Sequence, residues 1–206
     1  MKLTAARRPG SVLRVSKHAA PIRLLALGGT TRTGSSSERA LRLAGAAAES
    51  AGAEVEYRVG ADLVLPIYAP ETADRTPEAA GLVEAARHAD GLLIASPGYH
   101  GGMSGMVKNA LDYIEDLREH DRVYLDGLPV GLIAVANGWQ AAVTTLENLR
   151  TVIHALRGWP TPLGVSLNSA AASDGPDPIE SARTQLELLV AQVIGFAGAS
   201  PAIAGM

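Results

Sequence analysis

The chain has 206 residues, 47% of them hydrophobic and 19% charged, with a formal net charge of -3 and an isoelectric point near 5.9. Because it has no cysteine, disulfide bonds, a thiolate nucleophile and cysteine-ligated metal sites are excluded. The slightly acidic charge and the 4% aromatic content argue against nucleic acid, and no apolar run approaches the roughly 18 residues of a membrane span. We therefore expect a cytoplasmic protein with neither nucleic acid nor a membrane as partner.

Residues 1–20 form a basic segment without an acidic residue. Its basic residues are Lys2, Arg7, Arg8, Arg14 and Lys17. The mixed polarity without a clear period predicts a mobile extension, and the arginines without acids are a weak organelle-targeting signature. The remainder, residues 21–206, shows no internal repeat and no linker, so we expect a single domain there.

From residue 22 onward, short apolar runs alternate with helical patterns. In chain order the expected elements are a strand over 22–27, a helix over 37–50, a strand over 53–59, a helix over 77–88, a strand over 91–96, a helix over 104–119, a strand over 129–136, a helix over 140–157, a strand over 163–168 and a helix over 178–196. This alternation predicts a doubly wound, five-stranded parallel sheet with helices on both faces, a three-layer α/β/α fold.

In such sheets, ligands bind beyond the carboxyl ends of the strands. The loops of interest are therefore 28–37, 97–104 and 137–140, which follow the first, third and fourth strands.

The first loop is rich in hydroxyl groups and leads into a helix. Its hydroxyl residues are Thr30, Thr31, Thr33, Ser35, Ser36 and Ser37. Together with Arg32 and the N–H groups of the helix N-terminus, they predict a site for a phosphate monoester. The loop lacks the GK[ST] of a nucleoside-triphosphate loop and the G-x-G-x-x-G of a dinucleotide turn. The alternative is a simple helix cap, in which Ser35 and Glu38 form a capping box.

The second loop is rich in glycine and predicts a site for a planar ligand. Its glycines are Gly98, Gly101, Gly102 and Gly105. They let the backbone approach a ring system, with Tyr99 and His100 beside it, although His100 also fits an ordinary loop histidine. For the residues that follow we favour structural roles: Lys108 and Asp112 pair on a helix surface, and Asn109 bonds to the backbone of this glycine-rich loop.

The sequence shows no catalytic triad and no metal-binding spacing. There is no G-x-S-x-G motif, and the five histidines are scattered. We therefore expect neither a side-chain acid or base in catalysis nor a metal.

Three stretches together resemble the NADPH-dependent FMN reductase family of flavodoxin-like proteins, from residue 22 to about residue 168. GGTTRTGSSSERAL is similar to the family's phosphate loop, G-[ST]-x-R-x-x-S. SPGYHGGMSGMVKNALD is similar to its signature P-x-Y-[NH]-G-x-x-x-G-x-[LV]-K-N-A-[IL]-D, and VANGWQAA to its third flavin loop. The resemblance implies a flavodoxin-like fold.

The resemblance also implies where FMN would bind. The implied phosphate ligands are Thr30, Arg32, Ser35 and Ser37. The residues implied to border the isoalloxazine are Pro97, Gly98, Tyr99, His100 and Gly101 on one side and Asn137 and Gly138 on the other. Gly98 stands where the family often has a larger residue, and His100 where asparagine is common.

The implied activity is hydride transfer from NADPH or NADH to flavin N5 and onward to an acceptor. The alternatives are an FMN-containing quinone, azo-dye or chromate reductase, a flavodoxin-type electron carrier, which TRTGSS at 31–36 also resembles, and a phosphate-ligand sensor. The implied partners are a small-molecule electron acceptor or a flavin-dependent monooxygenase. Trp139 would either stack at the rim of the site or pack against the protein.

The resemblance further implies a homodimer or homotetramer. Four residues of the helix after the second loop would supply a subunit contact or pack on their own sheet; they are Leu111, Tyr113, Ile114 and Leu117.

Overall fold

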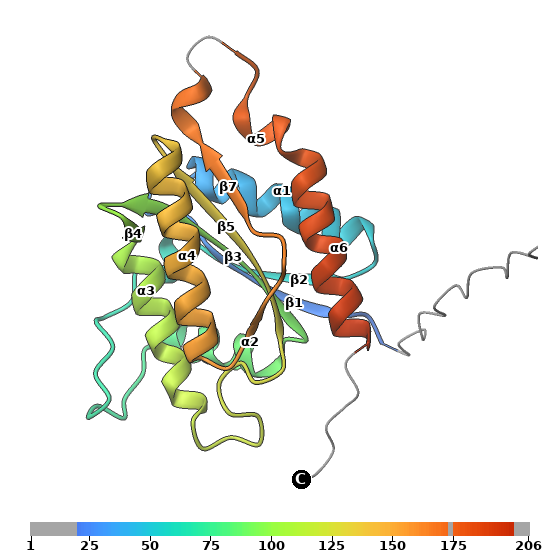
Figure 1. Ribbon diagram of the computed structural model, residues 1–206. Helices are drawn as coiled ribbons and strands as arrows, with labels where there is room; N and C mark the ends of the chain where they lie inside the picture. The colour runs from blue at the N-terminus through green and yellow to red at the C-terminus, as the bar shows by residue number, and fades with distance from the viewer. Residues whose placement is uncertain (1–19, 173–174, 200–206) are drawn as a thin grey trace, which may run out of the picture.

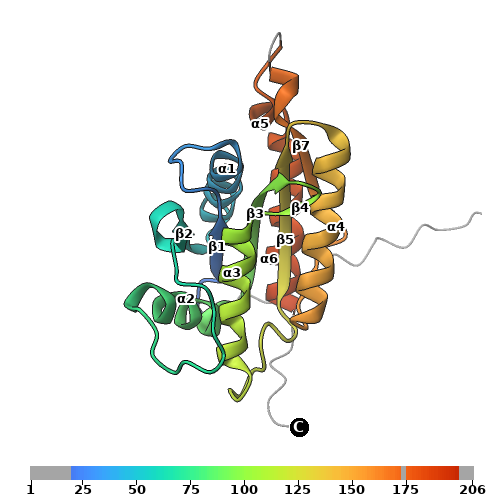
Figure 2. The same cartoon turned by 90° about the vertical axis from the view of Figure 1, so that its left-hand side faces the viewer.

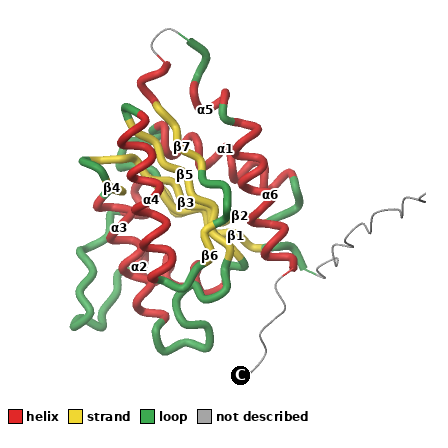
Figure 3. Tube along the Cα trace, viewed as in Figure 1, coloured by secondary structure: helices red, strands yellow, loops and turns green. Residues whose placement is uncertain are grey.

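A parallel β-sheet lies between two layers of helices (Figure 1). The computed structural model describes residues 20–172 and 175–199, so the predicted basic extension at 1–20 lies outside the described residues except for Ala20. Figure 3 shows the strands in yellow with helices on either side, and the predicted three-layer α/β/α architecture is confirmed.

The strands are β1 (Arg23–Gly28), β2 (Glu54–Val59), β3 (Gly91–Tyr99), β4 (Gly102–Met103), β5 (Pro129–Ala136), β6 (Trp159–Pro160) and β7 (Val165–Asn168). Their order is β2-β1-β3-β5, with β6 and β7 both paired to β5. All these pairs are parallel, and only the small strand β4 pairs antiparallel, with the end of β3. Since β6 pairs with the start of β5 and β7 with its end, the two form one interrupted fifth strand. This strand order is that of a flavodoxin-like doubly wound sheet.

The fifth strand is interrupted over residues 161–164, where one proline precedes the gap and a second lies within it. Pro160 and Pro162 lack the N–H that a sheet ladder needs. The gap is held instead by Arg150, whose guanidinium donates to the carbonyl oxygens of Thr161 and Pro162 at 3.3 and 3.1 Å. The regular strand therefore resumes only at Val165, two residues later than predicted.

The helices are α1 (Ser36–Ser50), α2 (Pro77–His88), α3 (Gly105–Asp112), α4 (Trp139–Ala155), α5 (Pro178–Ser181) and α6 (Arg183–Ala199), with the 3-10 turns η1 (Gly60–Leu63), η2 (Tyr113–Leu117) and η3 (Ser169–Ala172). α1 and α6 cover one face of the sheet, and α2, α3 and α4 cover the other (Figure 2). Alternate residues of β1 serve the two apolar cores: Leu24 and Ala26 face α1 and α6, while Leu25 and Leu27 face α2 to α4. No helix among the described residues has the length and apolar character needed to cross a membrane.

Two helices that were predicted as continuous are each divided into two elements in the structure. The helix expected over 104–119 is α3 followed by η2, and the helix expected over 178–196 is divided into α5 and α6. The division occurs at Ala182, whose N–H bonds to the carbonyl oxygen of Ile179, three residues back, at 3.1 Å. This tight turn contains neither glycine nor proline, so no local signal marks it.

Candidate functional site

A cleft of about 230 Å³ opens where the carboxyl ends of β1, β3 and β5 meet. All three predicted loops contribute to it, and a fourth segment, after β7, adds one residue. The lining residues are Thr30, Arg32, Ser35, Ser36, Ser37, Pro97, Gly98, Tyr99, Val135, Ala136, Asn137 and Ser169. Eight of the eleven predicted site residues thus lie around one cleft; His100, Gly101 and Gly138 do not line it.

A larger groove, of about 490 Å³, lies at the opposite end of β1 and β2. It is lined by Arg23, Glu54, Glu56 and His88 among others, and it has no helix N-terminus and no cluster of hydroxyls. Its size alone does not favour it, because parallel sheets bind ligands at their carboxyl ends.

The first loop leaves β1 through two glycines. Gly28 has φ +148°, and a Cβ atom there would lie 2.0 Å from the carbonyl oxygen of Ala95. Gly29 then donates its N–H to that same oxygen at 3.1 Å. The backbone therefore lies in direct contact with β3 as it turns toward α1. A residue with a side chain at position 28 would not fit there.

The N-terminus of α1 is capped and still offers free donors. The Ser35 hydroxyl accepts from the Glu38 N–H at 3.3 Å, as the predicted capping box requires, but the Glu38 carboxylate accepts from Gly34 at 2.9 Å instead of from Ser35. Nothing described in the structure accepts from the amides of Ser36 and Ser37, which are the unpaired groups of a first helical turn. Capping and anion binding are therefore compatible in this loop.

Arg32 lines the same cleft as these donors. The loop before it is closed by Thr30, whose hydroxyl accepts from the Arg32 N–H at 3.1 Å and donates to the Arg32 carbonyl oxygen at 3.2 Å. The guanidinium makes no hydrogen bond or ion pair to any residue that the structure describes. A free cation beside unpaired amides at a helix N-terminus is suited to an anionic group.

The second loop is a β-hairpin that joins β3 to β4. His100 and Gly101 are its two central residues, with φ of 51° and 89°, as in a type I′ turn. Tyr99 is 55% exposed and lines the cleft, whereas His100 at the tip does not. The base of the hairpin is held by buried Ser96, whose hydroxyl accepts from the Ser104 N–H at 3.0 Å.

The third loop is tied to the segment after β7, which the sequence did not indicate. The Ser169 hydroxyl donates to the Asn137 carboxamide oxygen at 2.7 Å, and both residues line the cleft. Ser169 follows directly on the fifth strand, so the rule that ligands bind at carboxyl ends would have included it. Trp139, which begins α4, is 60% exposed and does not line the cleft.

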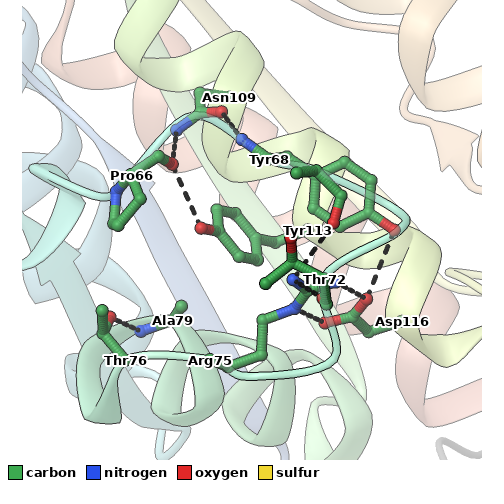
Figure 4. Close-up of polar contacts among 10 residues, drawn as sticks. Pro66, Tyr68, Thr72, Arg75, Thr76, Ala79, Asn109, Tyr113 and Asp116 are labelled. Carbon is green, nitrogen blue, oxygen red and sulfur yellow. Dashed lines mark hydrogen bonds and ion pairs between the residues drawn. The ribbon is translucent and has the colours of Figure 1, made fainter.

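Asn109, the asparagine of the K-N-A stretch in the signature, holds a neighbouring loop (Figure 4). Its Oδ1 accepts from the Tyr68 N–H at 2.8 Å, and its Nδ2 donates to the Pro66 carbonyl oxygen at 2.8 Å. Lys108 and Asp112 form a surface ion pair at 2.6 Å. The ion pair expected for Lys108 and Asp112 is confirmed, whereas Asn109 bonds to the backbone of residues 65–68 and not to that of the glycine-rich loop.

The same loop is clamped further along by Arg75 (Figure 4). The guanidinium of Arg75 makes two bonds to the Asp116 carboxylate, at 2.7 and 2.8 Å, and lies over the rings of Tyr68 and Tyr113. Hydrogen bonding to Asp116 raises the pKa of Arg75 above its usual value. This cluster fixes residues 64–76 on α3 and η2 and takes no part in the cleft.

The four residues considered for a subunit contact are buried within the chain itself. Leu111, Tyr113, Ile114 and Leu117 are each 3% exposed or less and belong to the core beneath α2 to α4. They pack on their own sheet. The described residues also hold no group of three or more histidines or carboxylates that could bind a metal ion.

Residues 22–172 match the family described as NADPH-dependent FMN reductase. A curated relative, the FMN-dependent NADPH-azoreductase of Staphylococcus aureus, is 33% identical over 125 residues, which are 58% of this chain and 63% of the relative. The match therefore spans less than two thirds of that relative's length.

Solved structures share the fold. The flavoenzyme NAD(P)H:(acceptor) oxidoreductase FerB from Paracoccus denitrificans superposes with a TM-score of 0.69 at 20% identity, covering 85% of this chain and 97% of that one. A flavodoxin from Pseudomonas aeruginosa gives a TM-score of 0.57 at 17% identity, covering 84% and 99%. The chain thus has the flavodoxin-like fold, and the family match over residues 22–172 shows that it belongs to the NADPH-dependent FMN reductase family.

Proposed function

We propose that this chain is an NAD(P)H-dependent FMN reductase whose cofactor lies in the cleft at the carboxyl edge of the sheet. The observation that carries the proposal is the convergence of three loops, far apart in sequence, on that cleft. The family match and the name of the azoreductase relative support it independently. The proposal takes residues 21–206 as a single FMN-binding domain.

The residues present fit FMN. Arg32, the unpaired amides of Ser36 and Ser37 and the hydroxyls around them suit a phosphate. Pro97, Gly98 and Tyr99 form a wall with little side-chain bulk except for one exposed aromatic ring, which suits a planar tricycle. His100, Gly101 and Gly138 are proposed to act through the backbone of their turns.

FMN, when bound, supplies the atom N5, which accepts a hydride from reduced nicotinamide and passes electrons to an acceptor. The protein's own part is binding and orientation. Arg32, Ser35 and Ser37 would anchor the phosphate, and Asn137, oriented by Ser169, would close the opposite side. Because the hydride passes directly between donor and acceptor, no side-chain acid or base is required.

The acceptor is proposed to be a small molecule or a flavin-dependent monooxygenase that takes reduced flavin. An azo compound is the first acceptor to test, because the curated relative is named an azoreductase; quinones and chromate come next. A flavodoxin-type carrier is disfavoured, since such carriers are strongly acidic for docking and this chain has a net charge of -3. We also propose a cytoplasmic homodimer or homotetramer, which sedimentation velocity would test.

The direct test is a visible absorption spectrum of the purified chain, with assays of NADPH and NADH oxidation in the presence and absence of added FMN. A yellow, active protein indicates a bound cofactor, and a colourless protein active only with FMN indicates a diffusible one. A colourless protein that neither binds FMN nor oxidises nicotinamide contradicts the proposal. FMN binding without steady turnover would instead indicate a carrier or a sensor.

Arg32→Ala tests the phosphate end of the site. A charge-assisted hydrogen bond contributes about 1.5–3 kcal/mol, so the substitution is expected to weaken FMN binding by about 10- to 150-fold. Arg118→Ala is the matched control, because that arginine is also exposed and, among the residues that the structure describes, forms ion pairs with the neighbouring Glu115 and Glu119 alone. Fluorescence titration measures both, and equal FMN affinities in the two variants would argue against this anchor.

A further inference from the structure

The hairpin of β3 and β4 lies against α4 (Figure 2). At its base, Gly98 leaves no room for a side chain. A Cβ atom at Gly98 would lie 2.6 Å from Oγ1 of Thr145, 3.0 Å from the Cβ of Ala136 and 3.2 Å from the carbonyl oxygen of Ala141. Thr145 is fully buried, and a β-branched residue in a helix has few alternative rotamers. The hairpin therefore lies closer to α4 than any larger residue at position 98 allows.

Two side chains of α4 bond to the far strand of this hairpin. The Thr145 hydroxyl donates to the Gly102 carbonyl oxygen at 3.3 Å. Asn148, three residues on, accepts the Met103 N–H at 3.2 Å. Since Gly98 pairs with Met103, and Tyr99 with Gly102, these bonds hold the strand that carries the cleft-lining residues.

The use of the Thr145 hydroxyl is distinctive among the threonines of α4. Thr144 and Thr151 are exposed, and their hydroxyls donate back to their own helix, to the carbonyl oxygens of Gln140 and Glu147 at 3.0 Å. That is the ordinary behaviour of threonine inside a helix. Thr145 is the buried one, and its hydroxyl donates across to the hairpin instead.

We propose that Thr145 is a positioning residue for the FMN site, which together with Gly98 seats the hairpin on α4 and sets how far Pro97, Gly98 and Tyr99 project into the cleft. The inference rests on the proposed function, because it concerns how tightly and in what orientation the cleft binds FMN. Thr145 does not itself line the cleft and acts through the hairpin.

The test compares Thr145→Val, Thr145→Ser and Thr144→Val in the full chain. Valine keeps the shape of Thr145 and removes only the donor, serine keeps the donor, and Thr144→Val makes the same change one residue away on the solvent side. The measurements are the FMN dissociation constant, the visible spectrum of bound FMN and the melting temperature of the protein without FMN. All binding is measured well below that melting temperature.

Loss of one neutral hydrogen bond predicts a dissociation constant about fivefold higher for Thr145→Val, with a shifted flavin band. Thr145→Ser and Thr144→Val are expected to bind FMN as the unaltered chain does. A lower melting temperature with unchanged affinity and spectrum would show a purely structural role and overturn the inference. If the unaltered chain binds no FMN, the proposed function fails, and the inference fails with it.

Gly98→Ala tests the contact between Gly98 and Thr145 by changing the hairpin instead of α4. It is also the test to use if Thr145→Val does not fold. The added methyl group meets the Thr145 hydroxyl, so the hairpin must move away from α4. FMN affinity is expected to fall by about fivefold or more. Adding Thr145→Ala, which removes the obstructing hydroxyl, is expected to recover part of that loss. No recovery in the double variant would overturn the pairing of the two residues.

Discussion

At the scale of single residues, two glycines of the same hairpin are required for different reasons. Gly98 has an ordinary backbone conformation but no space for a Cβ atom. Gly101 has open space, with no atom within 4 Å of an added Cβ, but its φ is 89°. The first glycine therefore serves packing and the second serves the turn. A count of glycines in the sequence shows neither reason.

Gly101→Ala is expected to lower the free energy of unfolding by about 1 kcal/mol, because an L-residue in the left-handed region is strained by about 1–2 kcal/mol. Gly105→Ala is the matched control: that glycine begins α3, has open space and does not have a positive φ. The control is expected to leave stability unchanged or slightly raised. Urea unfolding measures both, and equal losses would contradict the assignment of strain to position 101.

At the scale of elements, the loop of residues 64–76 is held on η2 by the ion pair of Arg75 and Asp116. The Arg75 and Asp116 side chains are only 15% and 23% exposed, so water screens them little. Tyr68 and Tyr113 pack edge to face beside them, with ring centroids 5.2 Å apart. Loss of the carboxylate would leave the largely buried guanidinium of Arg75 without its counter-ion.

Asp116→Asn is expected to lower the free energy of unfolding by about 1–3 kcal/mol and to expose the loop to limited proteolysis. Asp112→Asn changes the same residue type four positions earlier, in a pair that is 46% and 43% exposed. Such surface pairs contribute about 0.5 kcal/mol, so little change is expected there. Denaturant titration and timed trypsin digestion compare the two, and similar behaviour of both variants would count against the clamp.

The contact between α1 and β2 predicts an alkaline pH dependence. Burial, followed by the nearby Glu49 carboxylate, raises the pKa of Tyr57 to about 12 from 10. Between these values the unfolded chain loses the phenol proton while the folded chain keeps it, so the stability contributed by Tyr57 is fully present below pH 10 and declines as the pH rises toward 12. Relative to Tyr57→Phe, the unaltered chain should lose stability above pH 10, as denaturant unfolding at several pH values would show. A difference between the two that does not vary with pH would refute this.

At the scale of the whole molecule, cofactor binding and folding are linked. The cleft is assembled from four segments that are far apart in sequence, so a ligand held there binds the folded state and not the unfolded chain. Any such ligand stabilises the fold by an amount that grows with the logarithm of its concentration relative to its dissociation constant.

FMN at about one hundred times its dissociation constant is expected to stabilise the protein by about 2.7 kcal/mol, a rise in melting temperature of about 5–10 °C. Riboflavin, which lacks the phosphate, is the matched control and should give a much smaller shift at equal concentration. Differential scanning fluorimetry measures both. Equal shifts would show that the α1 N-terminus and Arg32 are not the phosphate anchor.

The sequence by itself determined the order of elements, the parallel three-layer fold and the three loops at the carboxyl edge. Those features depend on local patterns, such as apolar runs, a serine before a helix and glycines after a strand, which are readable within a few residues. Gly28 and Ser35 belong to this class, whereas the hairpin of β3 and β4 was predicted only as a glycine-rich loop.

Only the tertiary structure decided which groups meet across the chain. The bond from Ser169 to Asn137 joins residues 32 positions apart, and that from Asn109 to Pro66 spans 43. No local sequence signal indicates the division between α5 and α6. The same is true of the close contact between Gly98 and Thr145. The physical reason is that these features depend on how elements pack, and packing distances are set by the whole core and not by neighbouring residues.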